Sequence, residues 1–419
     1  MRSRTFRVLS VIVACLPPAS LEARQSFDCG FMSSGQVLRA LRSGAARQEY
    51  SDPAGRAIPA IPERPRAGRA GGGGFPCLNS AHIFQFEDTN FLLQTNFSTG
   101  ALLNLMTDAA NAVMATHGDN FDFVGYWVNS PPHHRIGTAF YAQIENDISG
   151  IGDALYNNRS SLGLGGQNIE GYVMMWNVND STWQPGTSPN ANFTRLALGQ
   201  EFEHRFAMFL PNLLDGRRLQ GNNGSCGREA HWSWSVDGQG SCMEIAEWVN
   251  RDLVGSFVTF NTDIGGVFSP TDLYLMGYLS PAEMDLMNSE LRYMDTSNCS
   301  TPYGGVISTF SSADIVASAG PRIPDSIVED HHYRTAWVMI HQPGDPPNTN
   351  ELQKAVSILR QHQVDWSDGT LGRGSMNNSL FDDSSCGGPT IPSASPWTLG
   401  LLMILILGAG ALLCLRRPA

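Results

Sequence analysis

Hydrophobic and polar positions along the central part of the chain follow two periods. Apolar residues recur at helical spacing over residues 101–117, whereas residues 121–129, 137–145 and 169–178 are short segments rich in aromatic and other apolar residues. A polar loop rich in Ser, Pro and Asn follows, and residues 195–210 return to helical spacing. The pattern predicts a helix, three strands and a second helix, in that order.

The second predicted helix carries the candidate chemistry, in the sequence RLALGQEFEHRFAMFL. In a zinc-hydrolase helix the pattern His-Glu-x-x-His places two imidazoles on one face, where both bind one metal, and the Glu polarises the bound water. Here Gln200 stands at the first ligand position, Glu201 at the base position and His204 at the second ligand position. The helix alone leaves a second interpretation open, in which it is an ordinary amphipathic helix with polar residues facing solvent or partners.

The N-terminal region has the pattern of an export signal. Residues 1–23 combine three arginines with a short apolar run and a small-residue cleavage site, and a lipoprotein box ending at Cys15 is the alternative. Residues 24–76 are rich in Arg, Ala, Gly and Pro and too poor in large apolar residues to form a core. We expect this region to be a disordered linker or propeptide.

The C-terminal region has the pattern of a membrane anchor. Residues 389–396 form a Pro-containing linker, residues 397–415 carry no charge over a length that spans a bilayer, and residues 416–419 form an Arg-rich end expected on the cytoplasmic side. The arrangement resembles a bacterial IPTL-type or PEP-type sorting tag, which implies a sorting or processing protease as a partner. A simple tail anchor is the alternative, and both place the body outside the cytoplasm.

Residues 77–388 form the predicted globular body, which is long enough for one large domain or two packed lobes. The formal charge of the chain is -12, which argues against nucleic-acid binding because that function needs a basic surface. Six cysteines outside the signal and the span suggest disulfides in an exported chain, and a bond between Cys226 and Cys242 would join the segment that holds His231. The six are Cys29, Cys77, Cys226, Cys242, Cys299 and Cys386.

Several strings beyond the helix carry a family resemblance. They are AHWS from residue 230, GSCME from residue 240, FSPTDLYLMGY from residue 268 and GPRIP from residue 320, together with NFDFVGYWVN at 120–129 and NDISGIG at 146–152. Their order resembles an exported bacterial family of zincin-like metallopeptidases with the pattern HExxHRW, HWS, GSxM and SPLDLYLMG. The resemblance covers roughly residues 120–375.

The resemblance implies a fold and a zinc site. It implies an α+β, zincin-like domain with a mixed sheet, an active-site helix and a helical C-terminal lobe, in which the strand at 169–178 runs along the cleft and pairs with extended substrate. It gives Glu201 the role of general base and makes Gln200 and His204 metal-ligand positions. A third ligand must come from downstream. His231 is the first candidate and Glu244 and Asp237 are the alternatives.

The glutamine at position 200 limits the expected activity. An amide oxygen is a poorer zinc ligand than an imidazole nitrogen, so zinc should be bound weakly or not at all. Glu203 lies on nearly the same helix face as Gln200 and is a possible substitute ligand. We expect the nitrogens of His204 and His231 to lie about 3 to 4 Å apart. The sequence therefore predicts a surface-anchored metallopeptidase-like protein acting on peptide or protein substrates, weakly or not at all, or an inactive relative that binds them.

Overall fold

The structure is a computed structural model that describes residues 78–381 with short gaps, and all statements below concern those residues. The gaps are residues 96, 134–138, 181–192, 222–229, 234, 237–240, 244–245, 249–257, 261–267, 288–291, 296–305 and 330. The predicted export signal, linker, membrane span and Arg-rich end lie outside the described residues. Within them, no helix has both the length and the apolar character needed to cross a bilayer.

The described chain combines helices with a mixed sheet. Its helices are α2 (Thr99–His117), α3 (Arg159–Leu162), α4 (Phe193–Glu203), α5 (Pro270–Leu275), α6 (Pro281–Met287), α7 (Ser312–Ala319) and α8 (Thr349–Gly369). Single 3-10 turns are η3 (Ser80–His82), η4 (Leu92–Gln94) and η5 (Val178–Asp180). The main sheet contains β1 (Ile83–Glu87), β2 (Phe123–Val128), β3 (Phe140–Gln143), β6 (Gly171–Asn177), β11 (His332–His341) and β12 (Ser375–Asn377).

The main sheet has the order β1-β11-β2-β6-β3, and β12 pairs with the start of β11. β1, β11, β2 and β6 are mutually parallel, whereas β3 pairs with β6 in the antiparallel direction. Three two-stranded ladders lie outside this sheet. They pair β4 (Glu145–Asn146) with β5 (Tyr156–Asn157), β7 (Ala246–Trp248) with β8 (Val258–Phe260), and β9 (Arg292–Asp295) with β10 (Val306–Thr309).

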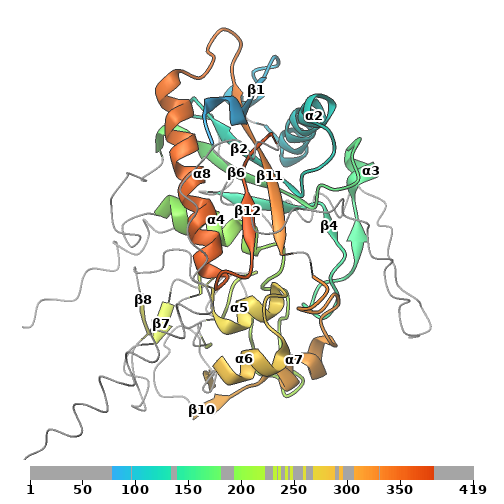
Figure 1. The fold of residues 1–419 in the computed structure, drawn as a ribbon. Helices are drawn as coiled ribbons and strands as arrows, with labels where there is room; N and C mark the ends of the chain where they lie inside the picture. The colour runs from blue at the N-terminus through green and yellow to red at the C-terminus, as the bar shows by residue number, and fades with distance from the viewer. Residues whose placement is uncertain are drawn as a thin grey trace, which may run out of the picture.

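Helices cover both faces of the sheet, which explains why its central strands are apolar throughout. Successive side chains of a strand point to opposite faces. Phe123 and Trp127 of β2 belong to the core shared with α4 and α8, whereas Val124, Tyr126 and Val128 belong to the core shared with α2. Figure 1 shows α2 on one side of the sheet and α4 with α8 on the other. All six residues of β2 are buried, as expected of a strand covered on both faces.

Gly125 is required where β2 meets β11. A Cβ atom at this position would lie 2.4 Å from ring atoms of Trp337, the residue paired with Gly125 in the ladder. The missing side chain leaves room for the indole, which packs between the sheet and α4 against Trp127 and Phe202. The glycine in the string NFDFVGYWVN therefore serves packing within the core that supports α4.

Most predicted elements are confirmed, and one predicted boundary is wrong. The predicted helix at 101–117 is α2, and the strands predicted at 121–129, 137–145 and 169–178 contain β2, β3 and β6. The predicted helix at 195–210 ends at Glu203 as α4, because the next residues form turns and then an irregular buried segment. His204 keeps a helical backbone hydrogen bond to Gln200 of 3.1 Å, so it still follows the register of α4.

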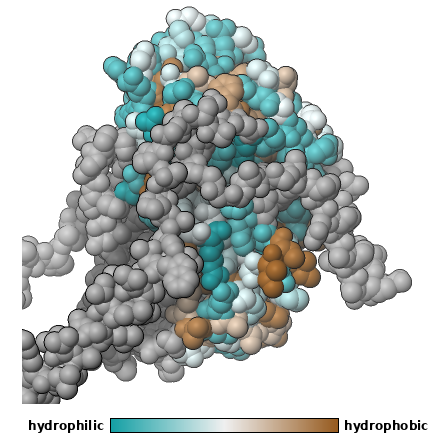
Figure 2. All heavy atoms as spheres, viewed as in Figure 1, coloured by the Kyte–Doolittle hydropathy of each residue, from teal (hydrophilic) through white to brown (hydrophobic). Residues whose placement is uncertain are grey.

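The chain after α4 builds the lower part of the molecule and then returns to the sheet. In Figure 1 the short helices α5, α6 and α7 gather below the sheet, whereas α8 runs alongside it next to α4. The predicted C-terminal helices therefore separate into two groups, and α8 belongs to the sheet region. Figure 2 shows hydrophilic residues over most of the described upper surface and hydrophobic groups near the lower end. The most exposed large apolar residues are Ile327, Leu286 and Leu214.

Candidate functional site

The candidate site lies at the C-terminal end of α4, against the edge of the sheet. α4 contacts β6, β3 and α8. Gln200, Glu201, Glu203 and His204 are all buried, with at most 2% of any of these residues exposed. The interpretation of α4 as an ordinary helix is therefore wrong for polar residues that face solvent, whereas its other form, in which they face partners, stays open. A helix buried on every side requires partners for its polar side chains.

The structure brings together Gln200, His204 and His231, the three metal ligands expected from the sequence. Nε2 of Gln200 lies 2.7 Å from Nε2 of His231. The rings of His204 and His231 meet edge to face, with their centroids 5.1 Å apart. Burial lowers the pKa of His204 well below its usual value, and the neighbouring His231 lowers it further. His204 is therefore a neutral imidazole at neutral pH.

The arrangement of these three residues does not fit a zinc site with three protein ligands. Ligands of a tetrahedral zinc at about 2.0 to 2.1 Å lie about 3.3 Å from each other. Gln200 and His231 are closer than that and are joined by a hydrogen bond. An amide nitrogen can only donate, so the ring nitrogen of His231 that faces it must accept, which engages the lone pair that a metal would need.

Glu201 has an unusual environment for a carboxyl group. It accepts a hydrogen bond from the backbone N–H of Tyr141 in β3, which lowers its pKa, but the larger effect of burial raises the pKa to about 8. Its Oε2 atom is buried without a hydrogen-bond partner among the described residues. Glu201 is therefore mostly a neutral acid at pH 7, whereas a general base must be ionised.

Glu203 is not a substitute metal ligand, because its side chain is bonded elsewhere. It forms a hydrogen bond with Asp272 of α5 and lies 2.6 Å from the Sγ of Cys242. Burial and the neighbouring Asp272 hold the pKa of Glu203 well above its usual value, so Glu203 carries the proton of this pair. We call Glu203, Cys242, Trp232 and Asp272 the carboxyl cluster. Its members come from α4, α5 and the chain between them.

Cys242 is a free, buried thiol in the structure. The predicted bond between Cys226 and Cys242 is not formed, and Cys226 itself lies outside the described residues. Burial, with Glu203 and Asp272 nearby, raises the pKa of Cys242 well above the usual thiol value. The thiol is therefore protonated at neutral pH, which leaves it free to donate to Glu203.

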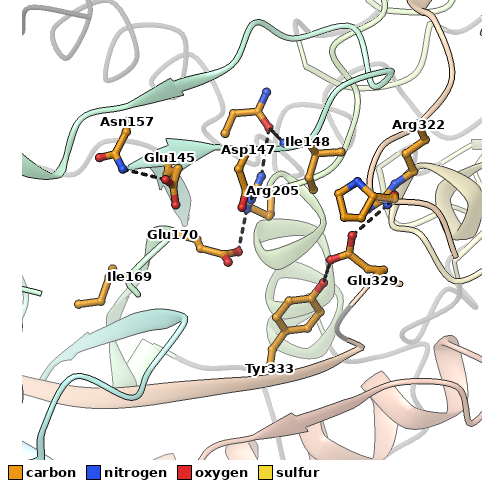
Figure 3. A network of polar contacts seen from close by, with 12 residues as sticks. Glu145, Asp147, Ile148, Asn157, Ile169, Glu170, Arg205, Arg322, Glu329 and Tyr333 are labelled. Atoms are coloured by element: carbon orange, nitrogen blue, oxygen red, sulfur yellow. Dashed lines mark hydrogen bonds and ion pairs between the residues drawn. The ribbon is translucent and has the colours of Figure 1, made fainter. Parts of the chain in front are cut away.

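Arg205 fixes the end of α4 to the segments beside the sheet. Its Nε donates to Oε2 of Glu170 at 3.0 Å, and its other nitrogens contact Asp147 and Asn146 (Figure 3). Arg205 is only 1% exposed, and its guanidinium remains charged because Glu170 and Asp147 offset the effect of burial on its pKa. The strings EFEHR and NDISGIG, which are far apart in the sequence, thus meet at the partly buried ion pair between Arg205 and Asp147.

The strand predicted to pair with substrate lies in the interior of the sheet. β6 is hydrogen-bonded to β2 on one side and to β3 on the other, so neither of its edges is open to a further strand. The edge position belongs to β3, which precedes β6 in the chain. In an antiparallel ladder, alternate residues direct their backbone groups away from the partner strand. The contact of the Tyr141 N–H with Glu201 is made from this outer edge.

Other histidines of the chain are structural. His133 is exposed in a loop, and His331 and His332 lie at the start of β11, where they bond to Gly277 and Ser375. Glu244 and Asp237, the alternative third ligands, lie outside the described residues. Met243, in the string GSCME, is buried in the core shared with α4.

Sequence reasoning missed the roles of Asp272 and Tyr141. Asp272 had a readable signal, because Ser269-x-x-Asp272 is the pattern of a capping box, and the structure forms that box at the start of α5. Its bonds to Trp232 and Glu203 had no local signal. Tyr141 acts through its backbone, so its side-chain identity gives no indication of the contact.

Comparison with known proteins gives no match. No family model, no curated protein and no solved structure matches the chain significantly. The family resemblance and the zincin fold therefore stay predictions.

Proposed function

We propose that this protein is an exported, surface-anchored, metallopeptidase-like protein whose peptide hydrolysis is weak or lost and which binds polypeptide. The observation that carries the proposal is the 2.7 Å contact between Gln200 and His231, in the position that the family resemblance gives to a metal site. The chain keeps Glu201 and His204 of the motif. The first ligand position holds Gln200, whose amide bonds to His231, the candidate third ligand.

The sheet supports the metallopeptidase-like part of the proposal. A mixed sheet with one antiparallel edge strand lies directly against the motif helix, and the edge strand contacts the Glu of the motif. All four residues of β3 are buried and its Tyr141 N–H already donates to Glu201, so neither β3 nor the interior strand β6 carries the proposed polypeptide contact, and the proposal rests on the motif.

The experiment restores the missing ligand. Position 200 lies one helical turn before His204, so Gln200→His places a third imidazole beside His204 and His231. We expect the natural chain to retain little zinc after dialysis and the variant to retain about one zinc per chain. The matched control is Gln363→His, because Gln363 is another buried glutamine and lies on α8. Hydrolysis of an unstructured casein, with and without a chelator, is measured on all three proteins.

Two outcomes would contradict the proposal. Stoichiometric zinc with brisk, chelator-sensitive hydrolysis in the natural chain would show a working peptidase. Failure of the natural chain to bind unstructured casein would remove the binding function, and that binding is measured in the same preparations by surface plasmon resonance. Zinc uptake by Gln200→His, but not by the natural chain or by Gln363→His, would show that the residue at position 200 decides whether the site binds zinc.

A further inference from the structure

We infer that Asp272 is a positioning residue, which holds both histidines of the site through their neighbours in the chain. The Nε1 atom of Trp232 donates to Oδ1 of Asp272 at 2.8 Å, and Trp232 directly follows His231. The side chain of Glu203 is hydrogen-bonded to the same Asp272, and Glu203 directly precedes His204. One carboxylate on α5 therefore determines the places of two residues that are far apart in the sequence.

Asp272 is itself held rigidly, which a positioning residue requires. Its Oδ2 accepts from the backbone N–H of Ser269 at 2.7 Å, and its own N–H donates to Oγ of Ser269 at 3.1 Å. The side chain of Ser241 also bonds to Asp272, and Asp272 is completely buried. These contacts leave the carboxylate no freedom to follow a movement of Trp232 or Glu203.

The contacts of Asp272 join four separated strings of the sequence. Glu203 belongs to the motif helix, Trp232 to AHWS, Ser241 to GSCME, and Ser269 with Asp272 to FSPTDLYLMGY. All four strings contribute a bond to Asp272 or supply Asp272 itself. The inference deepens the proposed function and depends on it for its biological consequence, because positioned histidines matter only if the site binds something.

The competing explanation is that Asp272 merely caps α5. A second capping box in the chain provides a control that distinguishes capping from positioning of the histidines. Ser311 and Asp314 form the same box at the start of α7, where Asp314 is partly exposed and pairs with Arg217. Asp314→Asn therefore replaces the carboxylate of an equivalent cap by an amide without touching the histidines. Asp272→Asn makes the same change in its own cap and also puts an NH2 donor in place of one acceptor of the carboxyl cluster.

The test records the ring nitrogen resonances of the histidines by NMR in the full, metal-free chain. We expect Asp272→Asn to shift the resonances of both His204 and His231, and Asp314→Asn to shift neither. Trp232→Phe keeps the aromatic bulk but removes the donor, and we expect it to shift His231 more than His204. The two resonances are assigned by their loss in His204→Asn and His231→Asn.

The outcomes distinguish positioning from capping without requiring any ligand. Equal effects of Asp272→Asn and Asp314→Asn on the two rings would overturn the inference. If Asp272→Asn does not fold, Trp232→Phe decides, and an unchanged His231 resonance in that variant would overturn the inference. Because the measurement uses neither zinc nor peptide, it can succeed even if the protein proves to bind no polypeptide.

Discussion

Glu201 and Glu203 are two residues apart on α4, both are fully buried, and their surroundings differ in one respect. Glu203 has a partner for its proton in Asp272 and a donor in Cys242. Glu201 has one backbone donor, from Tyr141, and an Oε2 atom without a partner among the described residues. Burial raises the pKa of both carboxyl groups, so the contrast lies in their hydrogen bonds.

The difference in hydrogen bonding gives Glu203 a structural role and Glu201 a candidate functional role on the same helix. A buried polar atom without a hydrogen bond costs about 1 to 3 kcal/mol, so proteins usually satisfy such atoms except where a ligand or a reaction supplies the partner. In the carboxyl cluster, the bond with Asp272 supplies the partner of Glu203, whose Oε1 atom has no other hydrogen bond among the described residues, so the cluster behaves as a support. The Oε2 atom of Glu201 lacks such a hydrogen bond among the described residues, which agrees with a site where a bound ligand supplies the partner.

We expect the largest loss of stability from removing the carboxylate of Asp272. Asp272→Ala leaves the Glu203 carboxyl, the Trp232 N–H and the Ser269 N–H without their acceptor in the interior. We expect the free energy of unfolding to fall by about 3 to 5 kcal/mol, measured by chemical denaturation. Asp314→Ala, at the matching position of α7, should cost only about 1 kcal/mol. Similar losses in the two variants would show that the carboxyl cluster adds nothing to capping.

The next effect concerns the unsatisfied carboxyl group and depends on pH. The pKa of Glu201 rises from 4.5 in the unfolded chain to about 8 in the fold, so the folded protein keeps a proton that the unfolded chain releases. Stability from this group is complete below pH 4.5 and is lost as the pH rises toward 8. Glu201→Gln does not titrate, and we expect it to gain roughly 3 kcal/mol over the natural chain at pH 7.

Denaturation of both proteins at pH 5 and pH 8 checks this expectation. The gain of the Glu201→Gln variant should be small at pH 5 and larger at pH 8. A difference that stays constant between the two pH values would mean that Glu201 does not change its protonation on folding, and the contrast with Glu203 would disappear.

The smallest effect belongs to the thiol of the carboxyl cluster. Cys242→Ala removes the donor that faces Oε2 of Glu203 and should cost about 1 kcal/mol of unfolding free energy. Cys242→Ser retains a donor and should cost less than the alanine variant. An alanine variant as stable as the serine variant would indicate that the contact between Sγ and Glu203 contributes nothing measurable.

Local patterns predict the elements well because each depends on neighbouring residues. The helical spacing that marks α2 and the apolar segments that contain β2, β3 and β6 are all visible in the sequence. The motif also places Gln200, Glu201 and His204 on one buried helix, and the order of the strings makes His231 the first candidate to join them, as it does in the fold. These predictions require only the geometry of a helix, the chemistry of a metal site and the family resemblance.

Long-range contacts cannot be predicted in the same way. α4 ends at Glu203, and Arg205 just beyond it pairs with Glu170 and Asp147 from other segments, contacts that the helical pattern of the apolar residues after Phe206 does not reveal. The interior position of β6 depends on β3 turning back antiparallel beside it, and strand order is not encoded in the periodicity of one strand. The bond between Gln200 and His231 likewise depends on how two distant segments meet.

The position of β11 has a consequence for the order in which the protein is made. β11 lies between β1 and β2, but it is the last of the four parallel strands to leave the ribosome. β1 therefore has no neighbour in the sheet until synthesis has passed His341, although β2, β6 and β3 have partners earlier. Non-local pairing of this kind makes folding slow. Because β11 ends at residue 341 of 419, the main sheet stays incomplete until about four fifths of the chain has been synthesised.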